Sequence, residues 1–155
     1  MKTYAERDGD DFILNGSKVF ITGGINADMV IVCALTDKNA KKAAHGISMF
    51  LVDTSLPGFR KGRNLKKLGL AASDTAELFF EDCRVPKDAL LSGEDGFNKG
   101  FHFLMHDLGR ERIMVSVSAA IGIETIYEMT RNKMKTMEVD GIPKVKNQVL
   151  YRTVL

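Results

Sequence analysis

Residues 11–24, DFILNGSKVFITGG, carry the pattern that decides the fold of the first part of the chain. Apolar and polar residues alternate on both sides of Asn15-Gly16, a dipeptide typical of two-residue hairpins because both turn positions need a positive φ. The segment therefore predicts short strands at 11–14 and 17–21 joined by a turn. A further strand at 4–7 is followed by Asp8-Gly9-Asp10, which predicts another turn.

Three more apolar runs extend this β-pattern to about residue 86. MVIVCAL at 29–35 and ISMFLVD at 47–53 are continuous apolar runs of strand length, and AELFFE at 76–81 is a further strand. The polar segment 36–45 predicts a loop. Short strands separated by turn residues, with no helical pattern between them, indicate an antiparallel barrel or sandwich.

The pattern changes to a helical period after Leu91. Residues 96–135 contain no proline, and apolar residues recur there at helical spacing. A glycine costs about 1 kcal/mol relative to alanine inside a helix, so we expect a break or kink at Gly109. A second helix is then predicted from about 110 to 137, and residues 140–143 end it.

The fold class predicted from these patterns is α+β, with an antiparallel β-barrel or sandwich domain over residues 1–92. Long α-helices of a truncated helical bundle follow over 93–155, where the last residues begin another helix. A single long amphipathic helix cannot bury its apolar stripe alone. We therefore expect the chain to be a piece of a larger protein.

Composition is that of a soluble globular protein, with 45% hydrophobic and 27% charged residues. The 22 Lys+Arg and 20 Asp+Glu leave a formal net charge of +2, which offers no electrostatic case for nucleic acid. The one basic cluster, RKGRNLKK at 60–67, predicts a solvated loop or edge strand, or else a contact with a phosphate-bearing ligand or an acidic partner. The sequence contains no run of about 18 apolar residues, so no transmembrane segment is predicted. Cys33 and Cys83 are expected to be free thiols.

Glu111 is the first candidate for chemistry, because it lies in LGRER at 108–112, near the start of the second predicted helix. The simplest interpretation is a carboxylate that interacts with the helix dipole, an effect of about 0.3–1 kcal/mol. The alternative is a general base. If the carboxylate faced a closed apolar pocket, desolvation would make it a stronger proton acceptor for a weak carbon acid.

The segment 20–24, FITGG, is the second candidate. It is most simply a strand end with a turn. The alternative is a platform for a flat ligand, with an aromatic ring, a hydroxyl group and glycines that permit close approach. His102 and His106 are four residues apart, but no Glu lies between them in an HExxH arrangement, so no metal site is predicted.

Four segments together resemble the acyl-CoA dehydrogenase family, and most of all its long-chain type. They are DFILNGSKVFIT at 11–22, AHGISMFLVD at 44–53, LGLAASDTAELFFEDCRVP at 68–86 and GFNKGFHFLMHDLGRERI at 96–113. They occur in the family's order and with family-like spacing, and they cover nearly the whole chain. The resemblance implies the family's central β-domain followed by the first helices of its C-terminal bundle.

This resemblance implies an FAD-dependent enzyme of fatty acid β-oxidation that converts a long-chain acyl-CoA to the trans-2-enoyl-CoA. Electron-transferring flavoprotein would be its partner, the mitochondrial matrix its location and a homotetramer its assembly. The alternatives are an acyl-CoA oxidase and a non-catalytic member that binds acyl-CoA or a protein. The 155-residue chain by itself is expected to be inactive.

The resemblance also implies roles for residues of the predicted helices. A minority of the family carries its catalytic base in a Glu-Arg pair, which Glu111-Arg112 matches, so Glu111 is the expected base. Gly109, Arg110 and Arg112 match positions that contact the CoA portion of the substrate. His102 matches a nearby ligand-contacting position.

The expected cofactor contacts are implied in the same way. Phe20, Ile21 and Thr22 match the segment that packs on the flavin ring, with Thr22 near N5. Gln148 matches a glutamine that contacts FAD, usually that of a neighbouring subunit. Many relatives have tryptophan at the position of Phe20. The arginine of the family that would meet the FAD pyrophosphate is replaced by Met137, so another residue would have to supply that charge.

Overall fold

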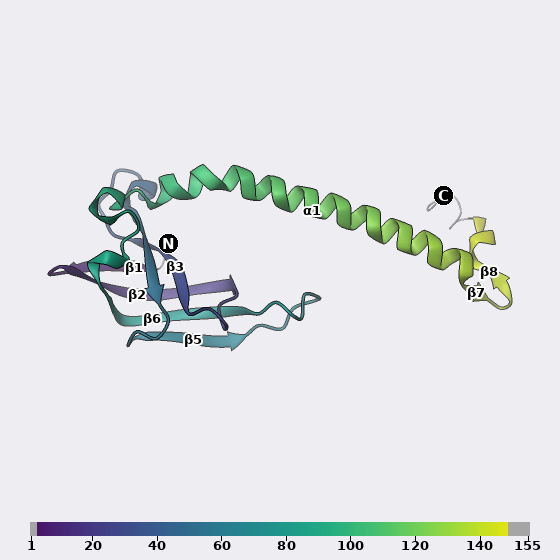
Figure 1. The fold of residues 1–155 in the computed structure, drawn as a ribbon, viewed down its shortest axis with the longest axis horizontal. Coiled ribbons are helices and arrows are strands. Elements are labelled where there is room, and N and C mark those ends of the chain that lie inside the picture. Colours follow the sequence, from purple (N-terminus) through teal and green to yellow (C-terminus); the bar gives the residue numbers. More distant parts are fainter. Residues whose placement is uncertain (1–2, 149–155) are drawn as a thin grey trace. The chain divides into compact units, whose positions relative to one another are not determined.

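The computed structural model describes residues 3–148, which are shown in Figure 1. The chain forms two compact units, Met1–His106 and Asp107–Leu155. The first unit contains a six-stranded sheet, and the second contains most of one long helix and a short β-hairpin. The predicted α+β class is confirmed.

The first unit contains β1 (Tyr4–Asp8), β2 (Asp11–Thr22), β3 (Met29–Leu35), β4 (Ile47–Asp53), β5 (Phe59–Asn64) and β6 (Thr75–Val85), with short 3₁₀ helices η1 (Ala43–Gly46), η2 (Lys87–Ala89) and η3 (Gly93–Gly96). Helix α1 (Gly100–Thr136) begins in the first unit and continues into the second, where β7 (Glu138–Val139), β8 (Ile142–Pro143) and η4 (Lys144–Lys146) follow.

The sheet of the first unit is mixed and open. Its strand order is β4-β3-β1-β2-β6-β5, and neighbouring strands are antiparallel except β1 and β3, which pair in parallel at Tyr4 and Leu35. No closed barrel forms among residues 3–148, because β4 and β5 end the sheet on opposite sides. Strand β5 contains the first part of the basic cluster, which is therefore an edge strand as predicted.

The predicted turn at Asn15-Gly16 is wrong, because β2 runs without a break from Asp11 to Thr22. The register between β2 and β6 shifts at this point, and Asp82 on β6 adopts a positive φ of 47°. The Asn15 side chain donates to Asp82 Oδ1 at 2.9 Å and accepts from the Asp82 amide at 2.8 Å. Asn15 therefore contacts a residue of a distant strand instead of forming a local turn. The turn predicted at Asp8-Gly9-Asp10 is confirmed, because β1 and β2 form a hairpin that turns at Gly9-Asp10.

The core of the first unit is built from the buried faces of these strands. Phe12 and Phe50 lie at its centre, with ring centroids 5.0 Å apart in an edge-on arrangement. Phe97, just before α1, packs against Phe12 at 6.1 Å, so the same core supports the start of the long helix. Cys83 is buried in the core and Cys33 is half-buried, and both are free thiols.

The predicted break at Gly109 is also wrong, because α1 is one helix of 37 residues. The cost of a single glycine, about 1 kcal/mol, is small beside the backbone hydrogen bonds that continue on both sides of it. The helix ends next to Met137, as expected, and β7 and β8 then form a hairpin whose turn, Asp140-Gly141, has a positive φ at both residues. The expected final helix falls mainly on residues 149–155, which lie outside the described residues.

The middle of α1 is apolar on every side. Residues 113–123 carry no charge, and Ile113, Val115 and Ile123 are each about 70% exposed. By length and composition alone an 18-residue stretch of α1, with a mean hydropathy of 1.2, could cross a membrane. A helix that packs inside a helical bundle has the same composition.

Candidate functional site

The predicted site residues fall into the two units. Residues 20–22 and His102 belong to the first unit, and residues 109–112 and Gln148 to the second. Each group is therefore described by itself.

Phe20 stands on a β-bulge. Lys18 pairs with Leu78 and Ile21 with Ala76, so three steps along β2 oppose two steps along β6. Phe20 absorbs the extra residue with a φ of 60°, an uncommon backbone conformation for an aromatic residue. Its ring is 76% exposed, because the bulge turns it out of the sheet. Bulges re-aim side chains in this way beside active sites.

Ile21 and Thr22 complete this segment with opposite roles. Ile21 is half-buried and packs against the core, which holds the end of β2 in place. Thr22 is exposed, and its hydroxyl has no hydrogen-bond partner among residues 3–148. Gly23, with a φ of 75°, leaves open space beside it. An exposed ring, an available hydroxyl and an open glycine together fit a flat polar ligand such as a flavin ring.

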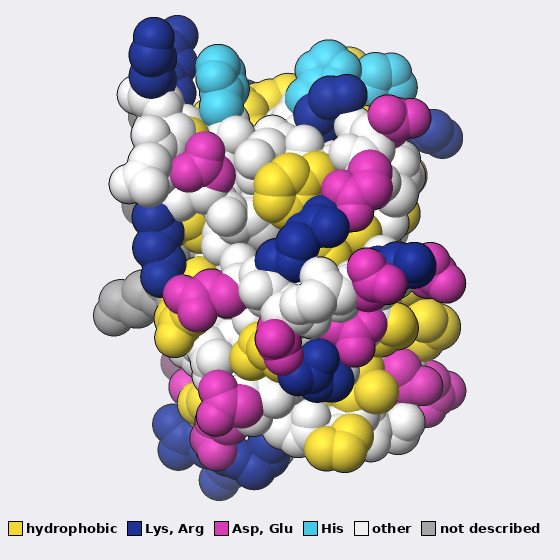
Figure 2. Space-filling view, turned by 90° about the vertical axis from the view of Figure 1, so that its left-hand side faces the viewer, with side chains coloured by type: hydrophobic (Ala, Val, Ile, Leu, Met, Phe, Trp, Pro, Cys, Tyr) yellow, Lys and Arg dark blue, Asp and Glu magenta, His cyan; other side chains and the backbone are white. Residues whose placement is uncertain are grey.

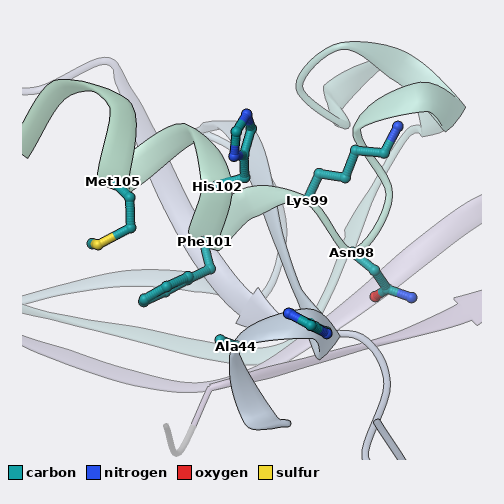
Figure 3. A pocket seen from close by; sticks show the side chains of 7 residues that line it. Ala44, Asn98, Lys99, Phe101, His102 and Met105 are labelled. Atoms are coloured by element: carbon teal, nitrogen blue, oxygen red, sulfur yellow. The ribbon is translucent and has the colours of Figure 1, made fainter. Parts of the chain in front are cut away.

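His102 lines a surface hollow of about 390 Å³ at the start of α1. The hollow is also lined by Ala44, His45, Asn98, Lys99, Phe101 and Met105. Figure 3 shows Phe101 and Met105 on the side of the helix that faces Ala44, whereas the His102 ring points away from it. Sequence reasoning missed Phe101 and Met105 as site residues. Their spacing of four places them on one helix face, but that pattern is equally typical of a core stripe.

The start of α1 is anchored to β4, which positions this hollow. The backbone amide of Asn98 donates to the Ser48 hydroxyl at 2.8 Å, and Thr36 Oγ1 lies 2.7 Å from the same oxygen. Gly100 packs so closely on β4 that an added Cβ would lie 2.9 Å from the backbone carbon of Ser48. A side chain at position 100 would therefore push the helix away from the strand.

Replacing Ser48 by alanine is expected to lower the free energy of unfolding of the first unit by about 1–3 kcal/mol, because it leaves polar partners of a fully buried hydroxyl unsatisfied. Urea unfolding followed by circular dichroism measures this change. The matched control is Ser55→Ala, which removes an exposed hydroxyl that bonds only to nearby Asp53. Equal losses in the two variants would contradict the anchoring role of Ser48.

Glu111 is exposed on α1 and has apolar neighbours on its own helix face. At spacings of three or four residues lie Asp107 and three apolar residues, Leu108, Met114 and Val115, which are 38%, 60% and 69% exposed. A partner surface laid over this face would enclose the carboxylate among apolar side chains. The arrangement is compatible with a general base, but the described residues do not supply the enclosure.

Gly109, Arg110 and Arg112 surround Glu111 on the same exposed part of α1. An added Cβ at Gly109 would meet nothing within 4 Å, so the glycine leaves open surface beside Arg112, three residues further on. Arg112 puts positive charge on this open surface, which suits an anionic ligand, whereas Arg110, two residues before it, lies on another side of the helix.

Gln148 is exposed at the end of the described chain. Met137 lines a cavity of about 530 Å³ with Met129, Thr130, Lys133, Met134 and Lys144. The Met137 amide donates to the Lys133 carbonyl, and the Lys144 amide donates to the Met137 carbonyl, both at 2.9 Å. Two lysines thus border the position where the resemblance leads us to expect an arginine.

Other charged and thiol groups of the first unit have structural surroundings. Figure 2 shows acidic and basic side chains interleaved on one face. The ion pairs of the first unit include Arg7–Glu94, Arg84–Asp8 and Lys87–Asp10. Burial lowers the pKa of Lys18 and raises the pKa of the Cys33 thiol. A thiol with a raised pKa carries little thiolate at neutral pH and is a poor nucleophile. Within residues 3–148 no three potential metal ligands come together.

Residues 1–83 match the family model described as acyl-CoA dehydrogenase, middle domain. The mitochondrial long-chain specific acyl-CoA dehydrogenase of Sus scrofa is 52% identical over 141 residues, which are 91% of this chain and 32% of that protein. The chain therefore spans about a third of the length of the curated relatives it matches.

Two solved structures are similar throughout the chain. The acyl-CoA dehydrogenase of Geobacillus kaustophilus gives a TM-score of 0.90 at 42% identity, over 99% of this chain and 40% of that one. The glutaryl-CoA dehydrogenase of Mycobacterium smegmatis, solved in complex with FADH2, gives a TM-score of 0.82 at 34% identity, over 99% and 37%.

Proposed function

Since this chain belongs to the acyl-CoA dehydrogenase family, we propose that the protein carrying it is an FAD-dependent enzyme that oxidises acyl-CoA thioesters to trans-2-enoyl-CoA. The observation that carries the proposal is the exposed Phe20 ring on its bulge, followed by the available Thr22 hydroxyl. The long-chain relatives support a long acyl chain as substrate and β-oxidation as the process.

FAD is the proposed cofactor, and the residues present fit it. Phe20 would lie against the flavin ring, Ile21 would hold the strand end on the core, and Thr22 would donate to the ring near N5. When bound, the flavin supplies an acceptor for the hydride that leaves the substrate β-carbon. Gln148 is proposed as a further FAD contact.

The substrate would extend over the surfaces around α1. Arg110 and Arg112 are proposed to pair with the CoA phosphates, because guanidinium groups bind phosphate strongly and with fixed geometry. Gly109 would leave room for the ligand beside them. His102 is proposed as a nearby polar contact, and Phe101 and Met105 as the apolar wall of the same hollow.

Glu111 is proposed to remove the α-proton of the thioester. The α-carbon is a weak acid, so the base must be positioned against it and shielded from water, and apolar neighbours on α1 favour that shielding. In this chain the carboxylate is exposed, so we propose that the 155 residues alone are inactive and that activity requires a covering surface such as further protein could provide.

We propose residues 1–92 as the central β-domain and 93–155 as the start of the helical domain. The compact first unit extends to His106 because Gly100 and Asn98 attach the first turn of α1 to β4. A helical domain also accounts for the apolar middle of α1, which would pack against other helices of a bundle.

Lys133 and Lys144 are proposed to supply the positive charge that the family arginine would provide at position 137. Replacing Lys144 by methionine is expected to weaken FAD binding several-fold, because an ammonium group near the cofactor phosphates is lost while the aliphatic stem remains. Titration of the apoprotein with FAD measures the change. Adding Met137→Arg to the Lys144→Met variant should restore affinity. Unchanged affinity in the single variant would contradict this role.

The proposed partner is electron-transferring flavoprotein, and the proposed assembly is a homotetramer. The proposed location is the mitochondrial matrix, because the long-chain relatives are named as mitochondrial proteins. The decisive assay is palmitoyl-CoA-dependent dye reduction by the complete protein with added FAD. Peroxide formed in step with substrate would indicate an acyl-CoA oxidase instead. A protein that never shows visible flavin absorbance, even with added FAD, would be a non-catalytic acyl-CoA- or protein-binding member.

A further inference from the structure

The segment directly after the proposed flavin contacts is held by several side-chain hydrogen bonds. Residues 23–28 connect β2 to β3, and their first five, GGINA, are called the 23–27 loop below. Gly23 and Gly24 can adopt more backbone conformations than other residues, and within the loop the Ala27 amide donates to the Gly23 carbonyl at 2.9 Å, so the remaining order depends on contacts from outside the loop.

Asp74, just before β6, supports the loop from one side. Its carboxylate accepts from the Ile25 amide at 2.7 Å and from Asn26 Nδ2 at 3.0 Å. Its backbone carbonyl accepts from the Gly23 amide at 3.1 Å. The bond from the Ile25 amide is the main reason why the pKa of Asp74 lies below its ordinary value, so the carboxylate stays charged at neutral pH.

Lys61 on β5 binds the same loop through its carbonyl groups. Lys61 Nζ donates to the Ile25 carbonyl at 2.9 Å and to the Ala27 carbonyl at 2.7 Å. The Thr54 hydroxyl adds a third donor, 3.1 Å from the Ala27 carbonyl. Ile25 is therefore bound on both sides, with its amide to an anion and its carbonyl to a cation.

We propose that Asp74 and Lys61 are positioning residues for the flavin, which hold the 23–27 loop and through it fix the direction of Thr22 and Phe20 before FAD binds. This inference rests on the proposed function. A strand end that is already ordered loses less conformational freedom when FAD binds. It therefore binds the rigid flavin ring more tightly than a mobile strand end would. Neither residue needs to touch the cofactor.

A purely structural role is the competing explanation, and it predicts a different pattern. If the two residues only stabilised the fold, any variant with the same loss of stability would bind FAD equally well. Asp8→Asn provides that comparison, because Asp8 also has a charged partner, Arg84, but lies next to Asp11, at the opposite end of β2 from Thr22.

The test uses the complete protein as apoprotein, with the variants Asp74→Ala, Asp74→Asn, Lys61→Met and Asp8→Asn. The FAD dissociation constant, the fine structure of the bound flavin's visible spectrum, the melting temperature and amide exchange at Ile25 are measured. Asp74→Ala and Lys61→Met are expected to bind FAD roughly tenfold more weakly, with a changed flavin spectrum and faster exchange at Ile25. Asp74→Asn keeps an acceptor for the Ile25 amide and should recover most of the affinity.

The outcomes separate this inference from the function on which it rests. Normal FAD affinity and spectrum in Asp74→Ala and Lys61→Met, with wild-type protein that binds FAD, would overturn the positioning role and leave the proposed function standing. An equal loss of affinity in Asp8→Asn would overturn it as well. Wild-type protein that binds no FAD would overturn both. If Asp74→Ala does not fold, Lys61→Met still decides, through the FAD dissociation constant, exchange at Ile25 and the flavin spectrum.

Discussion

Replacing Glu111 by glutamine is expected to lower the rate of acyl-CoA oxidation by roughly a hundred- to ten-thousandfold, the usual contribution of a positioned general base. Glutamine has nearly the same shape as glutamate but cannot accept the α-proton. FAD binding should not change, because Glu111 lies on α1 while the proposed ring contacts lie on β2. Single-turnover flavin reduction by palmitoyl-CoA measures the step directly.

The experiment has a second readout and a matched control. Wild-type protein should exchange the α-hydrogens of a bound substrate analogue with deuterated water, and Glu111→Gln should not. The control is Glu124→Gln, which changes the same group on the same helix, further along α1. Full activity in Glu111→Gln would remove Glu111 as the base. An equal loss in Glu124→Gln would show that the effect is not specific to that position.

Local sequence pattern predicted the strands better than the connections between them. The apolar runs at 29–35 and 47–53 coincide with β3 and β4, although β3 buries only alternate residues and leaves Met29 and Ile31 exposed. The turn at Asn15-Gly16 failed because the asparagine binds Asp82, a residue far away in sequence. Strand order depends on such long-range pairings, and no local pattern contains them.

In the candidate site, too, some features were evident from the sequence and others depend on long-range pairing. The aromatic and hydroxyl groups of Phe20 and Thr22 were evident from sequence, but the exposure of the ring comes from a register shift between β2 and β6 that local pattern does not contain. The support of the 23–27 loop by Lys61 and Asp74 was likewise not evident from local pattern. Lys61 lies on β5 and Asp74 directly before β6, both far from the loop in sequence. The role proposed for Glu111 comes from the Glu-Arg pair within the family resemblance, since its described surroundings alone leave it exposed.

Replacing Phe50 by alanine is expected to cost the first unit about 3–5 kcal/mol of unfolding free energy, the range for removing a large aromatic side chain from a packed core. Phe50 is fully buried on β4, and its ring meets Phe12 edge-on at 5.0 Å. A small domain has only about 5–15 kcal/mol in total, so a large fraction of the variant should unfold at moderate temperature.

The same substitution should also disturb the proposed site, because the core that loses Phe50 supports both of its parts in the first unit. Phe12 contacts Phe97, which precedes α1, and Ile21 packs on the same cluster beneath the flavin segment. Urea unfolding measures the loss, with Phe79→Ala as control, since Phe79 is only half-buried and stacks against Arg60. A change below about 1 kcal/mol in Phe50→Ala would contradict this central role, since buried aromatic truncations rarely cost so little. A large loss of unfolding free energy in Phe79→Ala as well would instead show that stability is spread over both faces of the sheet. The site would then depend on the whole sheet rather than on the Phe12–Phe50 contact.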